Sequence, residues 1–137
     1  MRWDAAGDDR YTCRSVAHAG MAWDEGVGYL IEDGGDDEYR TGDLSCGGAA
    51  QTGIAICIDR GGADSYQTGR ESQGGTGASE YHDKPSVGVL IDLGGKRDSY
   101  SAEGREDSTT RVLTGIELFL DLKARDMRAA LKSKQLR

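Results

Sequence analysis

Paired acidic residues are the most regular chemistry-bearing groups in this chain of 137 residues. An aspartate stands two residues before a tyrosine at four places, and a second acidic residue ends each of four short segments rich in Val, Ile and Leu. Side chains at equivalent positions of a repeated structure lie side by side in successive repeats. The first set is Asp9, Asp37, Asp64 and Asp98, and the second set is Glu32, Asp59, Asp92 and Asp121.

Stacked carboxylates suit a hard divalent cation, because Ca²⁺ prefers oxygen ligands and takes about six to eight of them. The residues that we expect to hold such an ion are Asp37, Asp64 and Asp98. The alternative is structural, since an aspartate side chain can close a turn by accepting hydrogen bonds from nearby amides. The spacing differs from that of calcium-binding G-G-x-G-x-D repeats. The sequence therefore favours structural turns and predicts no obligatory cofactor, with Ca²⁺ as the open alternative.

A second polar set lies seven residues after the tyrosine in each of the first three repeats. It consists of His18, Cys46 and Gln73, which we expect to stack as neighbours. A cysteine beside a histidine can act as an activated nucleophile. The same position is a turn flanked by small residues, where polar ladders are structural. No catalytic residue is therefore predicted.

The cysteines and the charge balance limit the function classes. Cys13, Cys46 and Cys57 are an odd number without a Cys-x-x-Cys pair, so they fit neither a disulfide framework nor a zinc site. With no apolar signal segment at the start, we expect free thiols and a cytoplasmic location. A net charge of -7 argues against nucleic-acid binding. The sequence has no run of about 18 apolar residues, so no membrane-spanning helix is predicted.

Three aromatic or imidazole side chains, Trp23, Tyr81 and His82, lie in segments of variable length between the repeated motifs. The third such segment is expanded and covers residues 76–86. Insertions in solenoids collect on one edge, which is often the binding face. Aromatic rings with acidic neighbours suit a sugar or a cationic group. We therefore expect a glycan or protein ligand there, with a tolerated surface excursion as the alternative.

Two motifs that alternate four times along the chain must position all of these residues. One is G-G-x-D-x-Y or a close variant, and the other is an apolar segment with the pattern G-V-G-h-L-h-D, in which h is hydrophobic. Apolar residues of the second motif alternate with a period of two and include many β-branched residues, which predicts β-strands. The four segments are 26–32, 53–59, 86–92 and 115–121.

The alternation gives each expected strand two faces. We expect the face that carries Val27, Tyr29, Ile31 and their equivalents to point inward and form the core. The opposite face then presents an outer apolar stripe, which is a candidate partner surface. This stripe consists of Leu30, Cys57, Leu90 and Phe119.

The repeat length sets the fold class. The tyrosines of the four turns are 28, 27 and 34 residues apart, which is typical of a solenoid whose coils stack parallel strands in register. The 21 glycines supply turn positions with positive φ. We predict an all-β, short right-handed parallel β-helix of about four coils over residues 1–122. A basic C-terminal helix over residues 123–137 is expected to cap it.

These motifs resemble the glycine-rich repeats of certain bacterial proteins. The segments GVGYLIEDGGDDEYRTG and GIAICIDRGGADSYQTG carry the resemblance, which covers roughly residues 7 to 122. It implies a right-handed parallel β-helix and no particular activity. A Gln-Gly element typical of those repeats survives as Gln73-Gly74, whereas His18-Ala19 and Cys46-Gly47 replace it elsewhere.

The sequence favours a non-enzymatic structural or binding module. We expect it to form a homo-oligomer or to bind a partner, because a solenoid has open ends and an apolar stripe is a contact surface. The surfaces proposed for this are the outer stripe and the loop edge. One alternative is a carbohydrate-active enzyme, by analogy of fold alone. The other is a module that Ca²⁺ stabilises.

Overall fold

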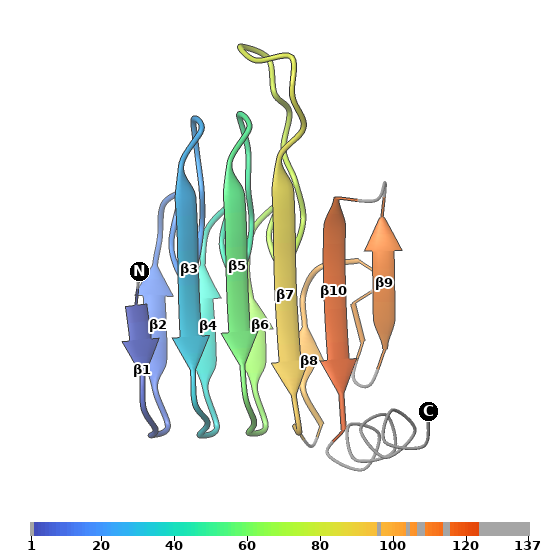
Figure 1. The fold of residues 1–137 in the computed structure, drawn as a ribbon. Coiled ribbons are helices and arrows are strands. Elements are labelled where there is room, and N and C mark those ends of the chain that lie inside the picture. The colour runs from blue at the N-terminus through green and yellow to red at the C-terminus, as the bar shows by residue number, and fades with distance from the viewer. Residues whose placement is uncertain (1, 96, 104, 107–108, 114–115, 124–137) are drawn as a thin grey trace, which may run out of the picture.

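A computed structural model describes residues 2–95, 97–103, 105–106, 109–113 and 116–123. Within these residues the protein is all-β, with ten strands wound into a solenoid of about four turns (Figure 1). No helix long and apolar enough to cross a membrane occurs in this part of the chain. Beyond Lys123, the predicted C-terminal helix at 123–137 lies outside the described residues.

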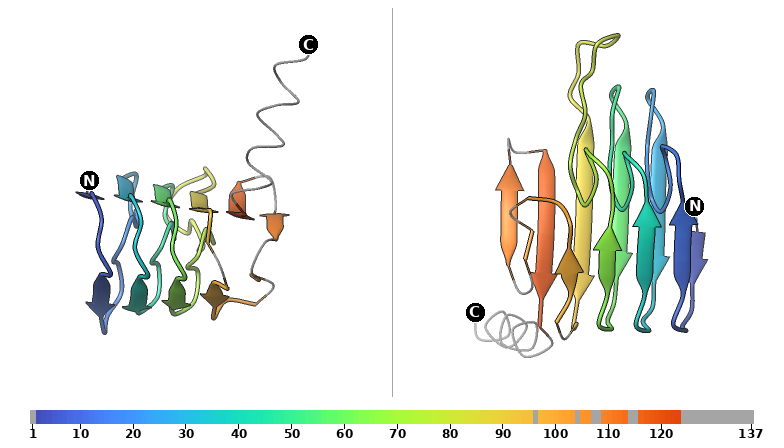
Figure 2. Two further views of the ribbon diagram at one scale, coloured as in Figure 1. Left: turned by 90° about the horizontal axis from the view of Figure 1, so that it is seen from below. Right: turned by 180° about the vertical axis from the view of Figure 1, so that it is seen from behind.

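The strands form two sheets that face each other across the interior (Figure 2, left). Sheet A has the order β1-β3-β5-β7-β10-β9, and its strands are parallel except for β9, which pairs antiparallel with β10. These strands are β1 (Arg2–Asp4), β3 (Val27–Glu32), β5 (Ile54–Asp59), β7 (Val87–Leu93), β9 (Thr110–Leu113) and β10 (Glu117–Leu122).

Sheet B is smaller, and all of its strands are parallel. Equivalent residues of successive coils lie directly beside one another in both sheets, which confirms the predicted solenoid and its parallel strands. The strands of sheet B, in order, are β2 (Arg10–Cys13), β4 (Glu38–Thr41), β6 (Ser65–Gln67) and β8 (Ser99–Tyr100).

The predicted inward face of the sheet A strands is wrong. Val27 and Ile54, which we expected inside, are 67% and 42% exposed. The supposed outer stripe is the core, because each of its members is at most 1% exposed and they pack into one cluster with the tyrosines of sheet B. The corrected residues, which cannot form an interface, are Leu30, Cys57, Leu90 and Phe119.

Small residues mark the inner face, because the backbone of neighbouring loop segments lies against it. A Cβ atom added to Gly28 would overlap the carbonyl oxygen of Met21, and one added to Gly88 would overlap that of Gly75. Along each of these strands, the inward side chains are first a small residue, then a large apolar residue and last an acidic residue. This order identifies the inside better than the β-branched residues do.

Stacked tyrosines run along the interior from coil to coil. Neighbouring rings have centroids 4.8, 4.6 and 4.9 Å apart and are nearly parallel, with interplanar angles of 6°, 3° and 10°. Phe119 ends the stack with an edge-to-face contact to the last ring. Offset stacking at such distances is favourable beyond simple burial. The stacked residues are Tyr11, Tyr39, Tyr66 and Tyr100.

The two faces of β7 provide a direct test of the corrected assignment. Leu90→Ala removes a fully buried side chain, so we expect it to lower the free energy of unfolding by about 2–5 kcal/mol. Ile91→Ala deletes a side chain of the same size from the half-buried outer face, and we expect less than half that loss. Urea denaturation of dilute protein measures both. Equal losses would contradict the assignment.

Candidate functional site

The inward acidic residues form two rows that face each other across the interior. One, the strand row, follows sheet A, where each member is the register partner of the next. The other, the turn row, stands just ahead of the sheet B strands. The strand row is Asp4, Glu32, Asp59, Asp92 and Asp121. The turn row is Asp9, Asp37, Asp64 and Asp98.

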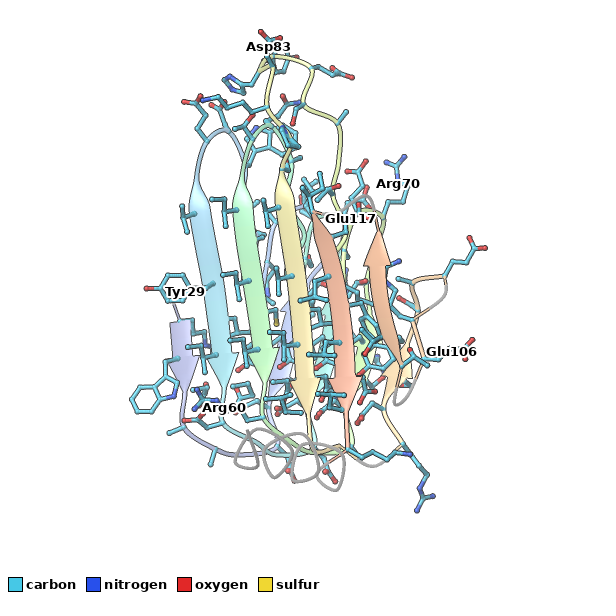
Figure 3. The ribbon with its side chains drawn as sticks, turned by 45° about the vertical axis from the view of Figure 1, so that its right-hand side comes forward. Tyr29, Arg60, Arg70, Asp83, Glu106 and Glu117 are labelled. Atoms are coloured by element: carbon cyan, nitrogen blue, oxygen red, sulfur yellow. The ribbon has the colours of Figure 1, made fainter. Side chains whose placement is uncertain are left out.

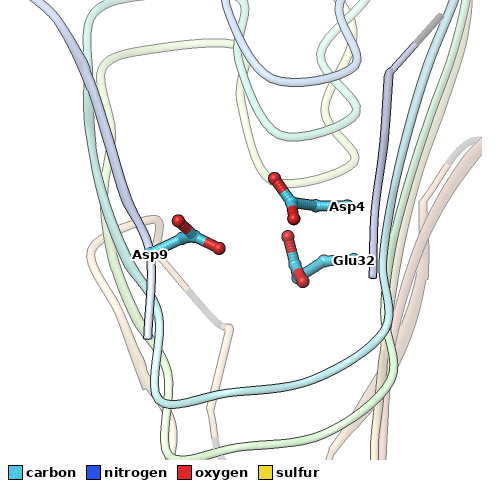
Figure 4. A group of neighbouring side chains, drawn as sticks. All are labelled: Asp4, Asp9 and Glu32. Carbon is cyan, nitrogen blue, oxygen red and sulfur yellow. The ribbon is translucent and has the colours of Figure 1, made fainter. Parts of the chain in front are cut away.

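Figure 4 shows the first members of the two rows. Asp4 on β1 and Glu32 on β3 project from one side, and Asp9 projects toward them from the side of β2. Carboxyls of the turn row thus lie beside those of the strand row. Asp4 was not predicted, because β1 is too short to show the repeated motif.

Tyrosine hydroxyls hold the strand row. The hydroxyl of Tyr39 donates to Asp59 Oδ2 at 2.8 Å, and that of Tyr100 lies 2.7 Å from Asp92 Oδ2. Tyr66 lies between them, with its hydroxyl 3.1 Å from Asp59 Oδ2 and 3.0 Å from Asp92 Oδ2. The tyrosine stack therefore serves the acidic residues as a line of hydrogen-bond donors.

Backbone amides hold the turn row. The amide of Asp9 donates to Asp37 Oδ1 at 2.7 Å, and that of Asp37 donates to Asp64 Oδ1 at 2.8 Å. The amide of Asp64 donates to Asp98 Oδ1 at 2.9 Å. In each case the donor belongs to the preceding coil. The structural interpretation of the sequence instead predicts amides of the same turn as the donors. Asp37, Asp64 and Asp98 therefore each link two coils through Oδ1.

Several carboxylate oxygens of the rows remain without a hydrogen-bond donor. Among the described residues, no donor reaches Oδ2 of Asp37, Oδ2 of Asp64 or Oδ1 of Asp92. All three residues are at most 2% exposed, and the buried side chains of the described residues include no Lys, Arg or His. A buried carboxylate without a cationic or hydrogen-bonding partner is costly. Asp37, Asp64 and Asp92 thus have no buried cationic side chain among the described residues to neutralise them.

Burial keeps these carboxyls protonated at higher pH than usual. It raises the pKa of Asp37 to about 7, that of Asp92 to about 8 and that of Asp64 to about 9. Neighbouring carboxylates, Asp59 above all, raise the pKa of each further because like charges repel. These buried carboxyls can therefore bind either protons or a cation.

Two buried triads bring the rows within reach of a single ion. One oxygen from each member lies within 4.8 Å of those from the other two, and Asp64 belongs to both triads. The residues predicted for a metal, Asp37, Asp64 and Asp98, are all included, and the structure adds a strand-row residue to each triad. The first triad is Asp37, Asp59 and Asp64, and the second is Asp64, Asp92 and Asp98.

The predicted stacking of His18 on Cys46 is wrong by one residue. His18 pairs with Ser45 in a parallel bridge. Ala19, Cys46 and Gln73 share positive φ angles of 54°, 49° and 52°, so Ala19 takes the equivalent position in the first coil. The reason is an extra residue between the first tyrosine and this turn. No cysteine–histidine nucleophile pair forms from these residues.

The other members of that set are structural. The buried amide of Gln73 donates to the carbonyl of Tyr66 at 3.1 Å and lies within hydrogen-bond distance of two hydroxyls. Cys46 and Cys57 are buried free thiols, and Cys13 is a half-buried one. A hydrogen bond with Cys46, together with burial, raises the pKa of Cys57. A thiol that stays protonated is a poor nucleophile.

The loop edge joins the first and third interstrand segments. His82 Nε2 lies 2.9 Å from Asp24 Oδ1 and its Nδ1 lies 3.6 Å from Glu25 Oε1. Trp23 is 49% exposed and Tyr81 is 77% exposed, and no ring contact joins them among the described residues. The expanded segment stands above the other loops in Figure 1. A ligand site at Trp23, Tyr81 and His82 stays a prediction.

A surface groove that the sequence did not indicate lies beside the fourth coil. Its volume is about 580 Å³, and its lining includes Arg70, Glu71 and Glu117, two of which are labelled in Figure 3. Glu117 Oε1 accepts hydrogen bonds from the amide and the hydroxyl of Thr76, at 2.8 and 2.6 Å. Its carboxylate is thus engaged in joining two coils.

The tyrosine hydroxyls can be tested without disturbing the ring stack. Tyr66→Phe removes the hydroxyl between Asp59 and Asp92, so we expect the free energy of unfolding to fall by about 1–3 kcal/mol. Tyr81→Phe alters an exposed hydroxyl and serves as the matched control, with an expected change within about 0.5 kcal/mol. Chemical denaturation measures both. Indistinguishable variants would show that the hydroxyl does not support the row.

The raised pKa values predict how stability depends on pH in the presence of a chelator. The unfolded pKa of an aspartate is near 3.8, whereas the folded values are about 7 for Asp37, 8 for Asp92 and 9 for Asp64. The native state therefore binds more protons than the unfolded state between these limits. Their stabilising contribution is complete below about pH 4 and is lost as the pH rises through 7 to 9.

Urea titrations from pH 4 to pH 9 in chelator measure this loss, and an unfolding free energy that rises over the interval would contradict it. Among the described residues, the groups that face these three carboxyls are other acids and tyrosines, namely Asp9, Glu32, Asp59, Asp98, Asp121, Tyr66 and Tyr100.

Comparisons with known proteins give no further lead. No family model matches the chain, and no curated protein or solved structure matches it either. The resemblance to bacterial glycine-rich repeats therefore stays a prediction, and the function has to be inferred from the surfaces and the interior described above.

Proposed function

We propose that this protein is a non-enzymatic β-solenoid module that self-associates through the outer face of sheet A. The observation that supports this most directly is the chemistry of that face. Charged residues make up 30% of the chain, but none of the outward side chains that the structure describes on β1, β3, β5, β7 and β10 is charged. These outward side chains are Trp3, Val27, Tyr29, Ile31, Ile54, Ile56, Ile58, Val87, Val89, Ile91, Leu93, Leu118, Leu120 and Leu122.

The outer face is continuous because the strands are in register. Tyr29, Ile56 and Val89 are register partners, and so are Ile31, Ile58 and their equivalents in β7 and β10. Tyr29 projects away from the sheet in Figure 3. Four strands about 4.8 Å apart, with about six residues of 3.3 Å each, give roughly 400 Å² in projection. The largest apolar patch of a typical monomer covers about 300–600 Å² and is often functional, which supports a role of this face in interaction.

A second copy of the chain is the occupant that fits. Each chain carries a net charge of -7, and two copies that meet through their uncharged faces keep these charges out of the contact. A two-fold arrangement presents the same patch on both sides. A standard interface buries about 800 Å² on each partner, so the rim must take part. Trp3, which is 63% exposed beside Ile31, is suited to anchor it.

The predicted C-terminal helix completes this arrangement. In the proposal, residues 123–137 form the basic helix that caps the last coil of a right-handed β-helix. They then leave the outer face to the second copy. Residues 123–137 carry six Lys or Arg and one Asp, so attraction to the acidic solenoid favours a position at its end.

The carbohydrate-active alternative has less support. Glycoside hydrolysis uses two carboxyl groups that flank the scissile bond at an accessible site. The carboxyls with pKa values raised to between 7 and 9, at Asp37, Asp92 and Asp64, lie in the closed interior. In the open groove, Glu117 is occupied by two hydrogen bonds from Thr76. These observations favour a module without catalysis.

A charged substitution in the middle of the outer face tests the proposal. We expect the full chain to sediment as a dimer, and Ile56→Lys to weaken the dimer about a hundredfold or more. The lysine lowers the net negative charge, so long-range repulsion cannot explain such a loss. Val16→Lys places the same change at an exposed turn residue and should leave the dimer intact. Analytical ultracentrifugation measures the association, and circular dichroism confirms that both variants fold.

Three outcomes would overturn the proposal. The first is a full chain that stays monomeric at the highest soluble concentration. The second is an Ile56→Lys variant that associates as the unchanged chain does. The third is a monomer that dimerises only after removal of residues 124–137, because the outer face would then be covered by the chain's own C-terminal segment.

A further inference from the structure

We infer that the interior of the solenoid binds two Ca²⁺ ions in a row, one at each buried carboxylate triad. Asp37, Asp59 and Asp64 form the first site. The second site uses Asp64 again, together with Asp92 and Asp98. This inference is independent of self-association, since the ions lie inside one chain and the proposed contact lies on its outer face.

The spacing of the oxygens fits an ion of this size. The three ligand atoms of each triad lie within 4.8 Å of one another. Ca²⁺ binds oxygen at about 2.3–2.6 Å, so two oxygens on opposite sides of one ion are about 4.6–5.2 Å apart. All three atoms of a triad therefore fit on a single coordination sphere. The second oxygens of the same carboxylates and water can supply the remaining ligands.

Unbonded oxygens point independently to a ligand. Asp37 and Asp64 each use Oδ1 to accept an amide hydrogen bond, and Asp92 uses Oδ2 to accept hydrogen bonds from tyrosine hydroxyls. The opposite oxygen of each residue is buried and has no donor among the described residues. Because one oxygen of each carboxyl is fixed by the fold, the other remains for a ligand of positive charge.

The charge of the interior also calls for cations. The two triads contain five different carboxyls, and no Lys, Arg or His is among the buried side chains of the described residues. Two divalent ions carry the charge that balances four of these carboxyls in their ionised form. Protons are the competing solution, because burial raises the pKa of Asp64 to about 9. Metal binding to such carboxyls releases these protons and is coupled to folding.

A third acidic group at the N-terminal end is not assigned an ion. Asp4 and Asp9 are half-buried, although Glu32 is fully buried, and Figure 4 shows the three carboxylates turned toward one another. Solvent that reaches this group can stabilise its charges without a metal. The assignment is therefore limited to the two triads that water reaches least.

Tyrosine-sensitised terbium luminescence provides a sensitive test. The full chain is unfolded in urea with a chelator and refolded with Tb³⁺, Ca²⁺ or neither, because the closed interior hinders exchange in the native state. Tyr39, Tyr66 and Tyr100 touch the strand-row carboxylates, so their excitation should reach bound Tb³⁺. We expect strong luminescence that Ca²⁺ displaces, two ions per chain by elemental analysis, and a higher unfolding midpoint with Ca²⁺.

Isosteric variants separate the two sites. Asp64→Asn removes the shared ligand and should abolish both ions, whereas Asp37→Asn should leave one. Asp98→Asn should also leave one, which keeps the test decisive if the Asp64 variant does not fold. Asp83→Asn changes an exposed carboxylate at the loop tip (Figure 3) and should still bind two.

Two results would overturn the inference. One is the absence of any luminescence or stabilisation above that of the chelated chain, which would show that protons alone neutralise the rows. The other is an ion count that Asp37→Asn and Asp98→Asn leave unchanged, which would place any bound metal elsewhere on the surface.

Discussion

Register between coils is the constraint on which the rest of this structure depends. Parallel pairing places each inward residue against its own equivalent in the next coil, about 4.8 Å away. For Leu30 or Tyr39 this contact is favourable, since apolar side chains pack and rings stack. For an acidic residue the same rule brings like charges together. The tyrosine hydroxyls, the turn amides and the unbonded oxygens are all arranged around that conflict.

The solenoid separates its two chemistries by the alternation of its strands. Inward positions of sheet A carry the acids that need a donor, a proton or an ion, and outward positions carry the aliphatic residues that need a partner surface. Ile58 and Asp59 are adjacent in sequence yet lie on opposite sides of the sheet. Ion binding would therefore stabilise the sheet without altering the groups on its outer face, and the two proposals can succeed or fail separately.

The periodic features were predictable from the sequence, and the features that depend on the backbone path were not. Spacing alone located the strands of sheet A and their parallel stacking in register. Hydrophobicity alone chose the wrong inner face, because Gly28 and Gly88 mark where neighbouring backbone comes close. Counting from the tyrosines misplaced His18 by one residue, since the first coil has an extra residue. The unbonded oxygens of the rows depend on which amide reaches each carboxylate, which no spacing reveals.

The links between turn aspartates have a consequence for the length of the molecule. Asp37 accepts a hydrogen bond from the amide of the coil before it, and its own amide donates to Asp64 in the coil after it. Asp64 has the same two roles toward Asp37 and Asp98. If one whole coil were removed or inserted, the turn amide of each coil could still donate to the aspartate Oδ1 of the coil that then follows it. These links therefore do not fix the number of coils, and among the described strands it is the antiparallel pairing of β9 with β10 that interrupts the parallel series.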